Sequence, residues 1–302
     1  VKNISAVVNE DGEFAFDVQG REFVPTDWSL QQFSIRSNVP SSTVIQKLRL
    51  QEDFDADDAA IMVGLANNAL RRLNQDKIYR MRTYTDGTCR AFVTDRYAPI
   101  DNRWYLEQLQ NNLPEGRLSH WRGDEDTIFG NILLPDTIID YGQSDDSDYG
   151  GMMSIGNCEI GKRRIQQVPS LFRSICLNGC IWGQVSGSAI KKRHIGNIDL
   201  VELGGQITAN INEQLPLLPM GVRKLLELRE LDCLDATMKS VFAAVAMENK
   251  FSKNEASEVL SQWAHNESQD KNLFGVVNSI TRAGQVFNNQ SWVKFDQIGG
   301  SM

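Results

Sequence analysis

Alternation of apolar and polar positions predicts strands in the first two thirds of the chain. Residues 14–18 alternate in this way after an Asp11-Gly12 turn, which predicts a β-hairpin. Residues 78–94 predict a second hairpin around a Thr-Asp-Gly-Thr turn. A further strand is predicted over residues 152–160.

Apolar residues at helical spacing predict helices between these strands. Thr26 or Asp27 can cap one helix, and Pro40 can open a second, short one. Residues 102–112 predict another. A longer helical run carries apolar residues at Ile61, Leu65, Ala69 and Leu73.

Residues 169–179 fit two different structures. Pro169-Ser170-Leu171 can open a short helix that Asn178-Gly179 closes, because Asn and Gly tolerate the left-handed conformation at a helix end. The same Asn-Gly pair can instead turn a hairpin. The sequence does not decide between the two.

The pattern becomes helical throughout from about residue 214. Apolar residues at helical spacing continue over residues 222–250. Ser252 and Glu255 form a capping box at the start of the next helix, and residues 273–283 predict a last one.

These patterns predict an α+β protein with antiparallel hairpins and short helices in its core. The core domain covers residues 1–205, and a helical C-terminal region covers residues 206–302. The apolar surface of the helical region is too wide to leave in water. We therefore expect that region to pack on the core or on another subunit.

The composition is that of an ordinary globular protein of the cell interior. The chain of 302 residues is 41% hydrophobic and 23% charged. Its five cysteines are odd in number and irregularly spaced, which argues against a disulfide framework. Residues 241–247 are too few to cross a bilayer, and residues 1–5 hold no apolar block like that of a signal peptide. We expect a protein of the host-cell cytoplasm that does not bind membranes.

Motifs for catalysis, metal binding and cofactor binding are missing from the sequence. The three histidines stand alone, and Cys176 and Cys180 lack the second pair that structural zinc usually needs. Gly-rich phosphate loops, the Gly-x-Ser-x-Gly elbow and the His-Glu-x-x-His zinc motif are absent. We predict no catalytic residues, no metal site and no cofactor, and we disfavour an enzyme.

Charge is segregated along the chain, although the net charge of −8 counts against nucleic-acid binding. Residues 124–148 contain eight acids and no Lys or Arg. Between Glu159 and Asp199 the pattern inverts, with seven Lys and Arg residues and no acid. Two solvated faces that balance each other would give this pattern. So would a phosphate-binding surface, whose charges should then lie on one face.

Basic residues on or beside the second hairpin and in the acid-free segment form the candidate site. Arg and Lys bind phosphates with release of counterions. Phe172 and Trp182 are stacking candidates, although large aromatic residues are mostly buried. Arg96 can also pair with Asp95 or Asp101 and so hold its corner of the hairpin. The candidate DNA-binding residues are Arg82, Arg90, Arg96, Tyr97, Lys162, Arg163, Arg164, Arg173, Lys191, Lys192 and Arg193.

Four stretches carry a family resemblance: residues 28–33 with Val39-Pro40, residues 90–102, residues 155–161 and residues 171–179. In order and spacing they resemble the phage- and plasmid-type family that is catalogued as domain of unknown function 932. That family commonly has Ser at the place of Cys158. The resemblance spans roughly residues 25 to 285, and one further similar stretch lies late in the chain, at residues 274–281.

The resemblance implies a mobile-element protein, often encoded among replication and recombination genes, and it brings no catalytic mechanism. The order of hairpin, helix and further strands is also loosely similar to that of phage single-strand annealing proteins.

We therefore expect a phage- or plasmid-encoded protein that binds single-stranded DNA and anneals or protects it. Homo-oligomerisation would multiply its contacts with the strand. The alternative is a protein-binding accessory or host-takeover factor. In that case the acidic segment 124–148 would mimic nucleic acid and bind a protein partner.

Overall fold

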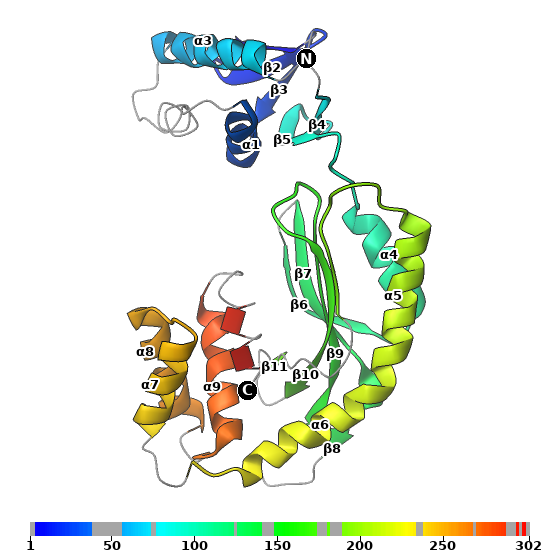
Figure 1. Cartoon of the computed structure of the whole chain (residues 1–302), viewed down its shortest axis with the longest axis vertical. Coiled ribbons are helices and arrows are strands. Elements are labelled where there is room, and N and C mark those ends of the chain that lie inside the picture. Colours follow the sequence, from blue (N-terminus) through cyan, green and yellow to red (C-terminus); the bar gives the residue numbers. More distant parts are fainter. Residues whose placement is uncertain are drawn as a thin grey trace. The chain divides into compact units, whose positions relative to one another are not determined.

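The computed structural model describes most of the chain, apart from several short segments (Figure 1). The described residues are 4–37, 56–73, 77–123, 126–140, 148–173, 180–181, 189–233, 238–267, 270–287, 294–295 and 298–299. Sheets, helices and antiparallel hairpins occur together with a helical C-terminal region, which confirms the predicted α+β class. Within these ranges, no helix is both long and apolar enough to cross a membrane.

The chain folds into two compact units, and each unit is made of three separate segments of the sequence. Unit 1 comprises Val1–Pro99, Glu159–Arg163 and His194–Ile198. Unit 2 comprises Ile100–Cys158, Arg164–Arg193 and Asp199–Met302. The predicted boundary between residues 205 and 206 does not coincide with this division.

Unit 1 contains a five-stranded sheet in the order β1-β2-β3-β5-β4. Its strands are β1 (Ile4–Val8), β2 (Phe14–Val18), β3 (Arg21–Pro25), β4 (Tyr79–Thr83) and β5 (Thr88–Thr94). The β1–β2 and β4–β5 pairs are antiparallel, which confirms both predicted hairpins, whereas β3 and β5 pair in parallel. Gly12 and Gly87 have positive φ angles in the two hairpin turns, a conformation that glycine adopts without strain.

Helices α1 (Asp27–Ser37) and α3 (Ala56–Arg72) complete the core of unit 1. Helix α1 packs against β5, and α3 packs against β1. The Oγ1 of Thr26 accepts a hydrogen bond from the Ser29 N–H at 3.2 Å, so the predicted cap is present. Phe16, Phe33 and Phe92 meet at this core, with edge-to-face contacts of Phe33 to both other rings.

Two of the four apolar positions of the predicted longer helical run, Ala69 and Leu73, are buried. Met62 and Ala66 are buried as well, whereas Ile61 is 54% exposed. A residue every four positions advances by about 40° around a helix of 3.6 residues per turn. A strict four-residue series therefore drifts out of the core, and here it begins on the solvent side. The short helix predicted at Pro40 lies outside the described residues.

Unit 2 contains an antiparallel sheet in the order β11-β10-β9-β7-β6. Two short strands join it, β8 beside β9 and β12 beside β10. Its strands are β6 (Arg117–Gly123), β7 (Thr127–Leu133), β8 (Ile139–Asp140), β9 (Asp148–Cys158), β10 (Ile165–Arg173), β11 (Cys180–Ile181) and β12 (Ile190–Lys192). A 3-10 turn, η1 (Pro135–Thr137), precedes β8.

The helix predicted to open at Pro169 is wrong, because residues 165–173 form strand β10. Val168 and Ser170 lie on one face of β10 and Pro169 on the other, and all three are buried. A strand that is buried on both faces lacks the polar alternation that would have revealed it. Leu171 pairs antiparallel with Ile181 in β11, which favours the hairpin alternative, although the Asn-Gly pair lies outside the described residues.

Helices α4 (Asn102–Asn112), α5 (Leu200–Gln214) and α6 (Leu218–Glu227) follow one side of the unit 2 sheet (Figure 1). The Tyr105 hydroxyl of α4 donates to the Gln166 carbonyl at 2.7 Å. The Gln167 amide donates to Asn210 of α5 at 2.9 Å. Short 3-10 turns, η2 (Leu215–Leu217) and η3 (Leu228–Glu230), flank α6.

The C-terminal region of unit 2 is helical, as predicted. It contains α7 (Met238–Glu248), α8 (Lys253–Gln262), the π-helical turn η4 (Trp263–Glu267) and α9 (Leu273–Val286). Ser252 and Glu255 form the predicted capping box at the start of α8. The Arg229 guanidinium donates to the Tyr149 hydroxyl at 2.8 Å, and the Phe274 ring packs on the same Tyr149. Helix α9 and η3 therefore pack on the sheet of their own unit, and α8 packs on α9.

We predict that Gly151→Ala loosens the contact between β9 and α6. A Cβ atom at Gly151 would lie 2.7 Å from Leu218 Cδ1 and 2.8 Å from Leu218 Cβ, so α6 would have to move away from the sheet. Overpacking of this kind costs about 1–3 kcal/mol, measured as a lower midpoint of thermal unfolding. Gly205→Ala in α5 is the control, since no atom lies within 4 Å of its Cβ position. Equal midpoints for the two variants would contradict the prediction.

Candidate nucleic-acid interface

Four of the predicted basic residues gather at one edge of the unit 2 sheet. Lys192 pairs with Ile165, and Lys191 pairs with Gln166, where β12 lies antiparallel to β10. Arg164 directly precedes β10, and Arg193 directly follows β12. The four cations, named here the β12 cluster, are Arg164, Lys191, Lys192 and Arg193.

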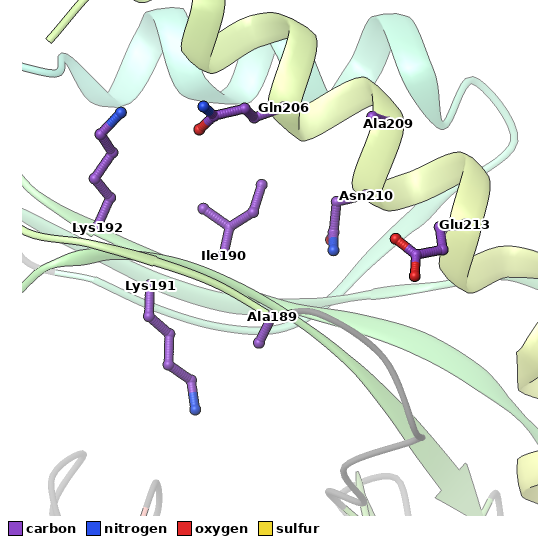
Figure 2. Close-up of a pocket in the computed structure, with 8 residues that line it drawn as sticks. All are labelled: Ala189, Ile190, Lys191, Lys192, Gln206, Ala209, Asn210 and Glu213. Carbon is purple, nitrogen blue, oxygen red and sulfur yellow. The ribbon is translucent and has the colours of Figure 1, made fainter.

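Strand alternation sends the two lysines of the β12 cluster to opposite faces of the sheet. Figure 2 shows Lys192 on the side that faces α5 and Lys191 on the other side. Between β12 and α5 lies a pocket of about 430 Å³. Its lining residues are Ala189, Ile190, Lys191, Lys192, Gln206, Ala209, Asn210 and Glu213.

The cations of the β12 cluster are accessible. Arg164, Lys191 and Arg193 are exposed, and Lys192 is half-buried. Within the described part of the chain, none of the four forms an ion pair. Glu213 is the one acid that lines the pocket, so the lining carries two positive charges and one negative charge. This edge can bind an anion and offers side-chain amides beside it.

The remaining residues of the acid-free segment lie elsewhere. Lys162 and Arg163 belong to unit 1, where Lys162 Nζ lies 5.8 Å from the centre of the Trp28 ring. Arg173 stands at the other end of β10, opposite Tyr149. The expectation that these charges lie on one face is wrong, because Lys191 and Lys192 point to opposite faces; what unit 2 brings together is the β12 cluster at one sheet edge. Of the stacking candidates, Phe172 is buried and Trp182 lies outside the described residues.

Arg82 and Arg90 on the second hairpin are engaged by a carboxylate. Arg90 Nη2 lies 2.9 Å from Glu159 Oε2, and Arg82 Nη2 lies 3.6 Å from the same oxygen. The Arg90 side chain is 8% exposed and its guanidinium stacks on Tyr84 at 4.0 Å. These two arginines hold unit 1 together. Sequence analysis missed Glu159, although it is the acid that begins the acid-free segment.

Tyr97 also serves the structure of unit 1. Its hydroxyl donates to the Glu159 carbonyl at 2.6 Å, and its ring stacks on His194 with centroids 5.5 Å apart. Arg96 is exposed, and within the described residues it forms no ion pair with Asp95 or Asp101. Arg96 is therefore the predicted residue of this hairpin that remains accessible to a ligand.

His194 is a buried imidazole in the same place. Its Nδ1 lies 3.2 Å from the Ala98 carbonyl, which can only accept, so Nδ1 carries the proton. Burial is the main reason that its pKa lies below the ordinary value; nearby Arg82 also lowers this pKa, whereas the Ala98 hydrogen bond and the Glu159 charge raise it. Nε2 is buried without a hydrogen-bond partner among the described residues.

The described residues do not show a metal centre or most of the acidic segment. No group of three or more His, Cys, Asp or Glu side chains in these ranges could hold a metal ion. In segment 124–148, the side chains of only two acids, Asp126 and Asp136, are described. The acidic face that the alternative function needs lies mainly outside the described residues.

We predict that Glu159→Ala destabilises unit 1 by about 3 kcal/mol or more, since it leaves the buried Arg90 without this counter-charge. Urea unfolding measures the loss. Glu107→Ala is the matched control, because Glu107 pairs with Arg103 at 2.9 Å in an exposed i,i+4 pair. Such pairs contribute about 0.5 kcal/mol or less. A loss for Glu159→Ala as small as that of the control would contradict the prediction.

The lowered pKa of His194 predicts a loss of stability in acid. The unfolded chain takes up a proton near pH 6.5, where the folded imidazole stays neutral. The contribution of His194 to the free energy of unfolding is therefore complete above about pH 6.5. It decreases as the pH drops below that value. The variant His194→Gln lacks this pH-dependent contribution. The difference in free energy of unfolding between the wild-type chain and the variant should therefore be smaller at pH 5 than at pH 7.5. Parallel pH profiles from urea unfolding would show that His194 does not contribute.

No protein-family model matches the chain, and neither does any curated protein or solved structure. The resemblance to the phage- and plasmid-type family therefore rests on the quoted residues and stays a prediction. Function has to be inferred from the side chains of this chain itself.

Proposed function

We propose that the chain binds single-stranded DNA, with the phosphate backbone held by the β12 cluster. The observation that carries this proposal is the gathering of four cations at one sheet edge, free of ion pairs in the described part of the chain. Cations that bind no protein carboxylate can exchange their counterions for phosphates, and that exchange drives binding.

The pocket beside the cluster favours an unpaired strand over a duplex. About 430 Å³ is a small-ligand volume, enough for one nucleotide-sized group. A base inside a duplex would first have to leave its stack to enter, which costs a few kcal/mol. Lys192 and the amides of Gln206 and Asn210 provide polar groups inside the pocket.

The family resemblance agrees with this proposal. Proteins encoded among replication and recombination genes of mobile elements meet single-stranded intermediates, which need to be annealed or protected. The overall charge of −8 opposes binding, so a single chain should bind modestly. Oligomerisation along one strand would raise the affinity by multiplying the contacts.

The test replaces the β12 cluster by glutamine in one variant: Arg164→Gln, Lys191→Gln, Lys192→Gln and Arg193→Gln. We expect weaker binding to a 20-nucleotide single strand, by a similar factor for different base sequences. The slope of the logarithm of the binding constant against the logarithm of the salt concentration should become less steep. The change should be about 0.7 for each phosphate that the variant no longer neutralises, or about 3 if all four cations bind phosphates in the wild-type chain. Fluorescence anisotropy over a salt titration measures both quantities.

The matched control removes four exposed cations elsewhere: Arg71, Arg72, Lys239 and Lys253, each changed to Gln. This variant has the same net charge as the first, but its changed residues lie outside the β12 cluster, so it should keep most of the affinity and the slope. Equal losses in both variants would mean that only overall charge matters. If the wild-type chain binds no DNA even at low salt, where these contacts are strongest, the proposal is wrong and a protein partner for segment 124–148 takes its place.

A further inference from the structure

The opposite edge of the unit 2 sheet exposes an aromatic ring. Strand β6 is the edge strand there, and its ladder with β7 is irregular between Ser119 and Arg122. Trp121 lies in this irregular part and is 44% exposed, while Leu118 beside it is 53% exposed. Among the described residues, the indole N–H has no hydrogen-bond partner.

The Trp121 ring lies against the sheet beside two glycines, and Gly130 makes room for it. A Cβ atom at Gly130 would lie 3.2 Å from Trp121 Cε3 and 3.3 Å from Leu118 Cδ1. A Cβ atom at Gly123 would lie 3.5 Å from Trp121 Cε2 and Cζ2. At Gly130 any other residue would crowd the ring, whereas a Cβ at Gly123 would meet the ring at an ordinary contact distance. Nearly half of its surface remains open to solvent, which makes Trp121 a supported platform.

The ring lies on the same sheet face as the pocket. Ile190 of the pocket, Gln167, Ile155 and Gly130 stand opposite one another in one row across β12, β10, β9 and β7. Strand β6 adds one more position beyond β7. With about 4.8 Å between strands, Trp121 and the β12 cluster are roughly 19 Å apart.

Cations lie in strand β6 itself, and acids follow it in the sequence. The strand has two arginines and no acid, and Arg117 is exposed with no ion pair among the described residues. Asp124, Glu125 and Asp126 come directly after the strand. An indole beside arginine on a sheet is the combination on which single-strand-binding proteins stack bases. A second copy of the chain fits less well, since the irregular ladder leaves β6 without a regular edge to pair with another strand.

We propose that Trp121 stacks on an unpaired base of the same strand whose phosphates the β12 cluster holds. This proposal rests on the proposed function. It assigns the ligand class of the second contact, an unpaired nucleobase. Between the two contacts the sheet face is buried, with Gln167 hydrogen-bonded to Asn210 of α5, so the strand must pass around this part of the face. A strand must then span several nucleotides to reach both contacts.

The experiment compares Trp121→Ala and Trp121→Leu with the wild-type chain. Both variants should bind a 20-nucleotide thymidine oligomer about tenfold more weakly, with an unchanged salt slope, because stacking involves no counterion release. Binding to an abasic deoxyribose-phosphate oligomer of the same length should not change. Trp121→Phe, which keeps an aromatic face, should recover most of the affinity.

The outcomes separate this proposal from the function on which it rests. If the wild-type chain binds the oligomer with a steep salt slope but Trp121→Ala binds equally well, the platform is excluded and the β12 cluster stands. A loss in Trp121→Ala that Trp121→Leu restores would indicate an apolar protein or second-copy contact, and would overturn stacking. Failure of the wild-type chain to bind any single strand removes both proposals. Circular dichroism of the variants checks that the exposed position tolerates each change.

Discussion

The buried ion pair between Arg90 and Glu159 is the constraint on which unit 1 depends. These residues are 69 positions apart, and their contact holds segment 159–163 in a unit built mostly from the first 99 residues. Around it, Trp28 and Gln32 both donate to the Ile160 carbonyl at 2.9 Å, and Tyr97 donates to the Glu159 carbonyl. A buried charge is tolerable when it is paired and hydrogen-bonded, and here both conditions are met.

The same pair decides which cations can serve a ligand. Arg82 and Arg90 form ion pairs with a protein carboxylate, whereas within the described residues the β12 cluster forms none, although Glu213 lines the same pocket. Phosphates compete poorly for a guanidinium that is already desolvated and paired, but they readily replace mobile counterions at an exposed edge. The number of charges in a sequence segment is therefore a poor guide to binding, because partners far along the chain neutralise some of them.

Local signals in the sequence predict local structure correctly. The Asp-Gly turns, the Thr26 cap and the Ser252–Glu255 capping box each depend on a few neighbouring residues, and all of them are present. Errors arise where packing decides. Pro169 lies in a strand buried on both faces, and Ile61 lies on the outer face of its helix.

The candidate site shows the same limit. Lys191, Lys192 and Arg193 are recognisable because they are adjacent, but their meeting with Arg164 depends on the β10–β12 register. Glu159 escapes sequence analysis because its partners lie far back in the chain. Trp121 escapes it because the packing of its ring on the sheet depends on Gly130, a residue of the next strand. None of these pairings leaves a periodic trace in the sequence.

Because each unit contains segments from several parts of the chain, unit 1 is completed late during synthesis. The chain passes from one unit to the other after residues 99, 158, 163, 193 and 198. Unit 1 thus stays incomplete on the ribosome until residue 198 has emerged, although residue 99 came out long before. At about 5–20 residues per second this interval lasts roughly 5–20 s. Until residue 159 emerges, Arg90 has no Glu159, although all five strands of the unit 1 sheet have already been synthesised. Because both units are built from several segments, no single cut in the gene would release either unit whole.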